Sequence, residues 1–213
     1  MADDVPLPVR RHHRLLIPLY SLPGAYFITI CAWHRRLLFG GVNQRVVQLS
    51  PLGLLIQHCW EEIPGYFPAA ELDLSVVMPN HFHAVVFIKP ELAGQPRAVQ
   101  KTDQPARNTR QPAEAGSASE QRRLTSLPRL VQAFKANATR RARQALAMSE
   151  AIWQASCWDH VIRDEAELRE IRQYILNNPQ AWELDRDNAA RSGLHPFYEW
   201  IEARRIPASQ KQN

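Results

Sequence analysis

The sequence has little cysteine, and what it has is widely spaced. Its 213 residues include three cysteines, Cys31, Cys59 and Cys157, with no Cys-x-x-Cys pair. Structural zinc sites and secreted disulfide frameworks use thiols at short, regular spacing. The pattern therefore argues against a zinc ribbon and favours a protein kept reduced in the cytoplasm.

Long apolar runs and a secretory leader are also missing. No apolar stretch approaches the ~20 residues that a membrane-spanning helix needs. Residues 1–4 contain two aspartates and no apolar core follows them, unlike a signal peptide. We therefore expect no membrane partner and a cytoplasmic location.

Acidic side chains are outnumbered by basic ones. The chain carries 26 Lys and Arg against 21 Asp and Glu, a formal net charge of +5. Its hydrophobic content of 45% and charged content of 22% are ordinary for a globular domain with a full core. The basic surplus suits a polyanionic partner such as nucleic acid but does not identify one.

Composition divides the chain into an irregular leader (1–23), a folded domain (24–185) and a carboxy-terminal extension (186–213). Within the domain, residues 91–123 contain no aromatic side chain and are rich in Gln, Ala, Pro and Arg. Such a segment cannot bury enough apolar surface to offset its ordering entropy. We therefore predict a disordered insertion there.

Alternating and β-branched segments predict strands at residues 25–32, 46–49, 71–78 and 81–88. The pair Pro79-Asn80 separates the last two and is typical of a tight turn. These two strands should therefore form a hairpin.

Three segments predict helices. Ser50 is a preferred cap for a helix that should end at Gly65, and residues 127–148 have an amphipathic pattern. The capping-box pattern at 164–167 opens a third helix, which Pro179 stops. The β-α-β-β-α order with antiparallel pairing predicts an α+β fold with the helices on one face of the sheet.

Two histidines open the last predicted strand. Alternate strand residues share a face and lie ~6.5 Å apart, so His81 and His83 can reach one cation while Phe82 points into the core. A lone His-x-His also fits ordinary packing. The His-x-His-x-Asp-His pattern of metallo-β-lactamases is excluded, because Val85 and Val86 stand at its last two positions.

Tyr174 and Asn178 are four residues apart and share one side of the third helix. A phenolate can attack phosphorus and form a covalent phosphotyrosine. With a pKa of ~10, about one phenol in a thousand is ionised at neutral pH, so the site must supply about 4 kcal/mol. Taken alone, Tyr174 also fits a packing role, and Asn178 before Pro179 also fits a helix stop.

A divalent cation on His81 and His83 would polarise a scissile phosphate and stabilise the leaving 3′ oxygen. Asn178 can add a neutral oxygen ligand. No carboxylate is expected among the ligands, which leaves the charge of the cation available to the phosphate. Magnesium prefers oxygen and manganese accepts imidazole, so we expect Mg²⁺ or Mn²⁺.

Basic side chains mark candidate contacts to a DNA backbone. They gather on the polar side of the helix at 127–148 and in the loop after the first strand. The candidates are Arg35, Arg36, Arg129, Lys135, Arg140 and Arg143.

Several motifs together resemble the REP-associated tyrosine transposases, a family of one-tyrosine HUH transposases of single-stranded DNA. The likeness covers about residues 24–185 without the insertion. Its most specific parts are Met-Pro-Asn-His-x-His at 78–83 and Tyr-Ile-x-x-Asn-Pro at 174–179. The other matching segments, in order, are 26–29, 35–36, 39–40, 134–135, 153–154 and 158–165.

The resemblance implies a sheet of ferredoxin-like topology and a DNA endonuclease that cuts and rejoins single strands near a palindromic hairpin. Cleavage would leave a 5′-phosphotyrosine and a free 3′-OH. By the same resemblance Tyr174 is the nucleophile, His81 and His83 bind the metal, and Asn178 matches the third ligand. The protein would act on DNA at the nucleoid, as a monomer or a homodimer.

Two other classes of function stay open from the sequence. A non-catalytic DNA-binding protein can use the same fold, and similar sheets occur in RNA-binding domains. The tyrosine and the histidine pair favour the transposase, because a protein that only binds has no need of a phenol facing a metal.

Overall fold

The computed structural model describes residues 23–89 and 126–204. The predicted insertion and all but the last residue of the predicted leader lie outside these residues, so both stay predictions. No helix in the described part is long and apolar enough to cross a lipid bilayer.

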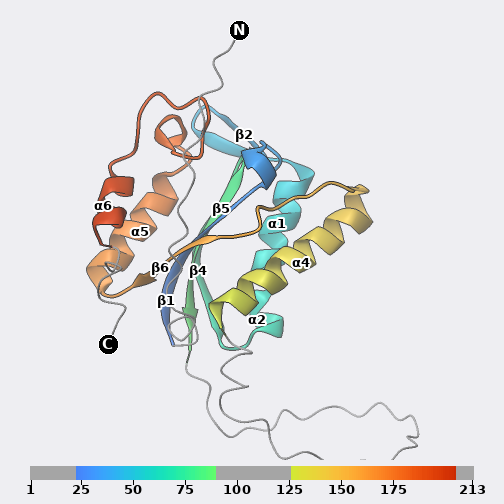
Figure 1. Ribbon diagram of the computed structural model, residues 1–213, viewed down its shortest axis with the longest axis horizontal. Coiled ribbons are helices and arrows are strands. Elements are labelled where there is room, and N and C mark those ends of the chain that lie inside the picture. Colours follow the sequence, from blue (N-terminus) through green and yellow to red (C-terminus); the bar gives the residue numbers. More distant parts are fainter. Residues whose placement is uncertain (1–22, 90–125, 205–213) are drawn as a thin grey trace, which may run out of the picture.

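Four strands form one antiparallel sheet in the order β4-β5-β1-β6 (Figure 1). Their bounds are Gly24–Cys31 for β1, Ala70–Met78 for β4, His81–Ile88 for β5 and Trp158–Ile162 for β6. Strand β1 is antiparallel to both β5 and β6, and β4 is antiparallel to β5. This order is that of a ferredoxin-like sheet, so the predicted α+β class and topology are confirmed.

The strand predicted at residues 46–49 forms outside the main sheet. Among the described residues, strand β3 (Val46–Leu49) pairs only with β2 (Gly40–Asn43), in a two-stranded ribbon. Helix α1 then packs closely beside this ribbon, and a side-chain carbon at Gly53 would overlap the carbonyl oxygen of Phe39.

Helix α1 (Pro51–Glu61) begins as predicted, since the Ser50 hydroxyl accepts a hydrogen bond from the Gly53 amide at 3.1 Å. It ends at Glu61 rather than at Gly65. Pro64 explains the difference, because proline has no amide hydrogen and its ring clashes with the carbonyl four residues earlier. A separate turn, α2 (Ile63–Tyr66), follows instead.

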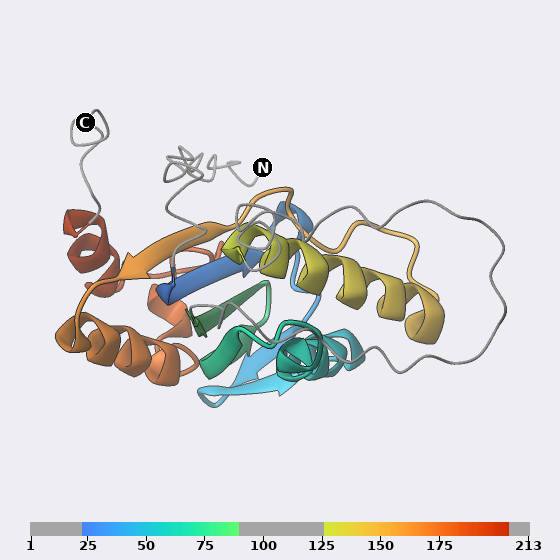
Figure 2. The ribbon, with the colours of Figure 1, turned by 90° about the horizontal axis from the view of Figure 1, so that it is seen from below.

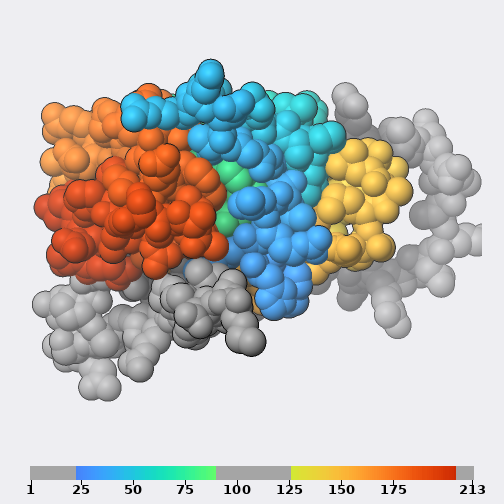
Figure 3. Space-filling view, turned by 90° about the horizontal axis from the view of Figure 1, so that it is seen from above, coloured from blue at the N-terminus to red at the C-terminus, as the bar shows by residue number. Residues whose placement is uncertain are grey.

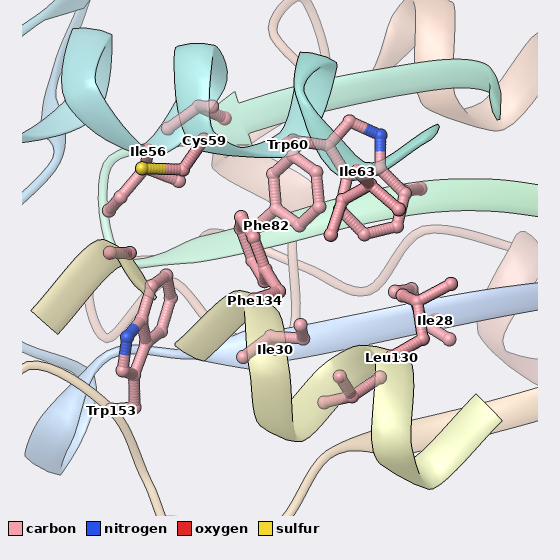
Figure 4. Close-up of a cluster of buried hydrophobic side chains, with 14 of the residues drawn as sticks. Ile28, Ile30, Ile56, Cys59, Trp60, Ile63, Phe82, Leu130, Phe134 and Trp153 are labelled. Atoms are coloured by element: carbon pink, nitrogen blue, oxygen red, sulfur yellow. The ribbon is translucent and has the colours of Figure 1, made fainter. Parts of the chain in front are cut away.

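Helix α4 (Leu127–Leu146) packs beside α1 on one face of the sheet. An aromatic cluster fills the space between them (Figure 4). Ring centroids of Trp60 lie 5.1 Å from Phe82 and 5.2 Å from Phe134, and those of Phe82 and Phe134 lie 5.4 Å apart. Phe82 thus points into the core, as the strand alternation predicted.

The opposite face of the sheet carries a second helical layer, which the sequence analysis did not foresee. Helices α5 (Glu165–Asn177) and α6 (Phe197–Ala203) cover Phe27 of β1 and Val85 of β5 (Figures 1 and 2). The two helices of the ferredoxin-like core, α1 and α4, lie on one face as expected. The additional layer matters because His81 and His83 face it.

Helix α5 begins at the predicted cap. The Asp164 carboxylate accepts a hydrogen bond from the Glu167 amide at 2.8 Å. The Glu167 carboxylate reaches past the cap to the Arg163 amide and to His160, both at 2.8 Å. These contacts fix the start of α5 against β6. Two single-turn 3₁₀ helices complete the described elements, Trp33–Arg35 and Trp182–Leu184.

Candidate active site

Two strand histidines and one loop carboxylate meet in the interior. One ligand atom from each of His81, His83 and Asp185 lies within 4.8 Å of the others, and all three residues are buried. The imidazole centroids are 4.4 Å apart, and Asp185 Oδ2 lies 3.7 Å from His81 Nε2. Imidazole nitrogens and a carboxylate oxygen are suitable ligands for a divalent cation. The cluster could therefore hold a metal ion.

Asp185 corrects the expectation that no carboxylate would stand near the cation. Its Oδ2 atom accepts hydrogen bonds from Tyr198 Oη at 2.9 Å and from Asn178 Nδ2 at 3.0 Å. Its Oδ1 atom accepts one from the Asp187 amide at 2.7 Å. These bonds hold the buried carboxylate group beside the two imidazoles.

The remaining nitrogen of each imidazole has a partner behind the cluster. The Nδ1 atom of His83 lies 2.9 Å from the Thr29 hydroxyl, and Nδ1 of His81 lies 2.9 Å from Asn80 Oδ1. Outer contacts of this kind orient a ligating histidine and select its tautomer. The Nε2 atoms therefore face the cluster.

Tyr174 projects from α5 into the same cluster. Its hydroxyl lies 3.3 Å from His83 Nε2, 3.4 Å from Asp185 Oδ2 and 2.6 Å from Tyr198 Oη. Its ring stacks on Phe197 with centroids 3.8 Å apart, and only 4% of the residue is exposed. The structure thus brings together the tyrosine and the histidine pair that the sequence analysis singled out.

Burial raises the pKa of the Tyr174 hydroxyl well above its ordinary value, and Tyr198 and Asp185 raise it further. The pKa of Tyr198 is also raised well above its ordinary value, first by burial and then by Asp185. Both hydroxyls are therefore held neutral. A cation on the cluster would act in the opposite direction, because it favours the phenolate.

Asn178 lies at the end of α5 with helical dihedral angles, φ −55° and ψ −42°. Pro179 does not force Asn178 out of the helical conformation, so the Asn178 side chain stays on the helix face that carries Tyr174. Its Nδ2 atom is bonded to Asp185, and its buried Oδ1 has no hydrogen-bond partner among the described residues. Its role as a further ligand stays a prediction.

Besides Asp185, the sequence analysis missed two further residues beside the cluster, Tyr198 and Asp187. Both lie in the segment that it treated as a carboxy-terminal extension. Figure 3 shows only a small area of the β4–β5 hairpin, in green, between the orange and red carboxy-terminal residues and the blue residues near β1. Residues 186–204 thus contribute to the cover and the hydrogen bonding of the cluster. No local pattern marks them in the sequence.

The predicted basic loop is close to the cluster, but both of its cations are paired. Arg35 Nε lies 3.1 Å from Asp187 Oδ1, and its side chain is only 9% exposed. The guanidinium of Arg36 pairs with Glu150 at the surface. Arg35 therefore supports the loop that carries Asp185.

Helix α4, which carries the other predicted basic residues, lies on the face of the sheet opposite the cluster (Figure 2). The Lys135 ammonium donates to the carbonyls of Gln154 at 2.8 Å and Ser156 at 3.0 Å, which ties the loop before β6 to the helix. Arg140 bonds side chains of its own helix, whereas Arg129 and Arg143 are exposed. Their predicted contacts to DNA stay predictions.

Fold and cluster define the class: an α+β protein with a ferredoxin-like sheet and a buried candidate metal site beside a tyrosine. The chain is 35% identical over 181 residues to a Haemophilus influenzae protein described as uncharacterized, covering 82% of this chain and 92% of that protein. The chain belongs to the same family as that protein. No protein-family model matches it.

Two solved structures are similar to the chain. One, described as a REP-associated tyrosine transposase bound to a REP hairpin, has a TM-score of 0.47 and 17% identity, covering 93% of this chain and 89% of that one. The other, a Deinococcus radiodurans R1 protein proposed to be a transposase, has a TM-score of 0.39 and 15% identity, covering 80% and 97%.

Proposed function

We propose that the chain is a metal-dependent tyrosine transposase that cuts and rejoins single-stranded DNA. One observation carries the proposal: the Tyr174 hydroxyl lies 3.3 Å from His83 Nε2, inside the buried cluster with His81 and Asp185. The resemblance of the two motifs to one-tyrosine transposases supports it. DNA hairpins of palindromic repeats are the proposed substrate, and Mg²⁺ or Mn²⁺ the proposed cofactor.

The donor atoms of the cluster fit such a cation. His81 and His83 would supply Nε2 atoms, Asp185 a carboxylate oxygen and Asn178 its unpaired Oδ1. The bound cation would supply Lewis-acid polarisation of the scissile phosphate. Two imidazoles together with oxygen ligands suit manganese well and magnesium less well.

Tyr174 would act as the nucleophile. Its oxygen forms a bond to phosphorus while the bond from phosphorus to the 3′ oxygen breaks, leaving a 5′-phosphotyrosine. The Tyr174 proton passes through its hydrogen-bonded neighbours Tyr198 and Asp185 to water, and the 3′ oxygen takes up a proton from water. The phosphodiester energy stays in the new linkage, so a second 3′-OH can reverse the attack and join two strands.

A covalent adduct tests the proposal. The full chain is incubated with hairpin-bearing single-stranded DNA and Mn²⁺, and the products are separated on a denaturing gel. Tyr174→Phe should abolish the adduct and leave DNA binding near normal, whereas Tyr66→Phe, at a half-exposed tyrosine of α2, should keep it. An adduct that survives in Tyr174→Phe and maps to Tyr198 would show that Tyr198, and not Tyr174, is the nucleophile.

A non-catalytic DNA-binding protein on the same fold is the second candidate. The burial of Tyr174 favours this candidate, because a phosphate reaches the hydroxyl only after neighbouring side chains move. The raised pKa of Tyr174 also favours it, because it keeps the hydroxyl neutral. Tight DNA binding without an adduct in any divalent metal would select this candidate. RNA of the same sequence should compete poorly in either case; strong competition would indicate an RNA-binding domain.

A further inference from the structure

The side-chain amide of Asn80 makes three hydrogen bonds in the interior. Its Nδ2 atom donates to the carbonyl of Asp187 at 2.7 Å and to the carbonyl of Arg35 at 3.1 Å. Its Oδ1 atom lies 2.9 Å from His81 Nδ1, and the residue is 1% exposed. All the polar atoms of this amide therefore face protein groups rather than water.

These partners determine which way the amide points. A carbonyl oxygen only accepts hydrogen bonds, so the two carbonyls require the NH₂ group on their side. The amide oxygen must then face His81, and it can only accept. His81 Nδ1 consequently carries a hydrogen, and in the neutral imidazole the lone pair is then on Nε2.

The Nε2 atom of His81 is the one directed at the cluster. It is buried and has no hydrogen-bond partner among the described residues, and the Asp185 carboxylate lies 3.7 Å away. A histidine binds a metal through a nitrogen that carries no hydrogen. The Asn80 contact thus produces the tautomer that ligation by Nε2 requires.

We propose that Asn80 is a positioning residue of the candidate metal site, which fixes the tautomer and ring orientation of His81 and joins them to the loop that carries Asp185. The inference deepens the proposed function and rests on its metal site. The turn between β4 and β5 holds the Asn80 backbone beside His81. Its bond to the Asp187 carbonyl lies two residues from Asp185, so one amide positions ligands from a strand and from a remote loop.

Aspartate cannot replace this amide. In Asn80→Asp the new carboxylate would still accept from His81, but it would place an oxygen against two carbonyl oxygens, with no hydrogen to donate. Asn80→Ala would remove all three bonds and leave the imidazole free to turn over. Loss of an outer contact of this kind typically weakens metal binding 10- to 100-fold.

Manganese affinity of the full chain, measured by titration calorimetry, is the first test. Asn80→Asp and Asn80→Ala should bind Mn²⁺ roughly 10- to 100-fold more weakly than the wild type. Asn43→Ala, at an exposed asparagine where β2 ends, should bind like the wild type. Wild-type affinity in Asn80→Ala would overturn the proposal, and so would a wild-type chain that binds no Mn²⁺.

Nitrogen-15 NMR of the histidine side chains is the second test. Its wild-type measurement does not depend on whether a variant folds. The metal-free chain should show His81 with its hydrogen on Nδ1, and Asn80→Ala should lose this preference while keeping its dispersed backbone spectrum. A wild-type His81 with its hydrogen on Nε2 would overturn the proposal. A chain that passes both tests but forms no DNA adduct overturns the proposed function alone.

Discussion

The hydroxyl groups of Tyr174 and Tyr198 lie 2.6 Å apart and share the carboxylate of Asp185. Tyr198 donates its hydrogen to Asp185 at 2.9 Å, so its oxygen is free to accept the hydrogen of Tyr174. The candidate nucleophile thus belongs to a chain of hydrogen bonds that ends on the buried carboxylate group of Asp185.

Removing the Tyr198 hydroxyl should make Tyr174 easier to ionise. Tyr198 is one of the causes that raise the pKa of Tyr174, after burial itself. In Tyr198→Phe the pKa of Tyr174 should therefore fall toward its ordinary value while staying above it. Carbon-13 NMR of labelled tyrosine as the pH is raised measures this pKa. An unchanged or higher value in Tyr198→Phe would contradict the expectation.

Alkaline pH should destabilise the fold through Tyr26. Burial, and to a lesser degree Asp159, raises the pKa of Tyr26 from 10.0 to about 12. A raised pKa means that the folded state holds the proton more tightly, so this contribution is full below pH 10 and is lost as the pH rises toward 12. Denaturant unfolding at a series of alkaline pH values should show a smaller loss of stability in Tyr26→Phe, by about 2–3 kcal/mol. Equal losses in both proteins would rule this out.

Truncation in the aromatic cluster should cost far more than truncation at the surface. Phe134 is fully buried between Trp60 and Phe82, and Phe134→Ala should lower the free energy of unfolding by about 3–5 kcal/mol. Leu176 is 57% exposed, and Leu176→Ala should stay within about 0.5 kcal/mol of the wild type. Urea unfolding measures both. Similar losses in the two variants would mean that this cluster is not the core of the fold.

Manganese should stabilise the folded chain through the cluster. A ligand at 100 times its dissociation constant adds about 2.7 kcal/mol when it binds only the folded state. Mn²⁺ should therefore raise the melting temperature of the wild type, and EDTA should reverse the change. His83→Ala and Asp185→Asn should lose this response, whereas His58→Ala, at an exposed histidine of α1, should keep it. A response that persists in both cluster variants would place the metal elsewhere.

Salt dependence of DNA binding should separate the cations of α4. Arg129 and Arg143 are exposed, and loss of one phosphate contact lowers the slope of log affinity against log salt by about 1. Arg143→Ala should show that decrease and keep the wild-type melting temperature. Lys135→Met should instead lower the melting temperature, because three carbonyls lose their donor. The reverse pattern would indicate that Lys135 contacts DNA and that Arg143 stabilises the fold.

Local patterns predicted the elements well because their causes are local. The Ser50 and Asp164 caps and the turn at Pro79-Asn80 depend on neighbouring residues, and each was confirmed. The break of the first helix was missed, although Pro64 marks it. The five-residue strand β6 was also missed, since its pairing with β1 joins residues more than a hundred positions apart.

The site could be predicted only as far as its motifs reach. The histidine pair and Tyr174 stand in recognisable patterns, and the structure brings them together. Asp185 and Tyr198 carry no such signal, because an isolated aspartate and a helical tyrosine are common everywhere. Only the fold of residues 182–203 over the sheet brings them to the histidines. The second helical layer escaped prediction for the same reason.

The alternation of β5 has a consequence for the chemistry. A slip of one residue between β1 and β5 would turn both imidazoles into the aromatic cluster and expose Phe82 to Tyr174. The edge-to-face contact of Phe82 with Trp60 and its tilted contact with Phe134 oppose that slip, because the slip would take a whole buried ring out of the core. Apolar side chains on one face of the sheet therefore keep the two histidines in register on the other face.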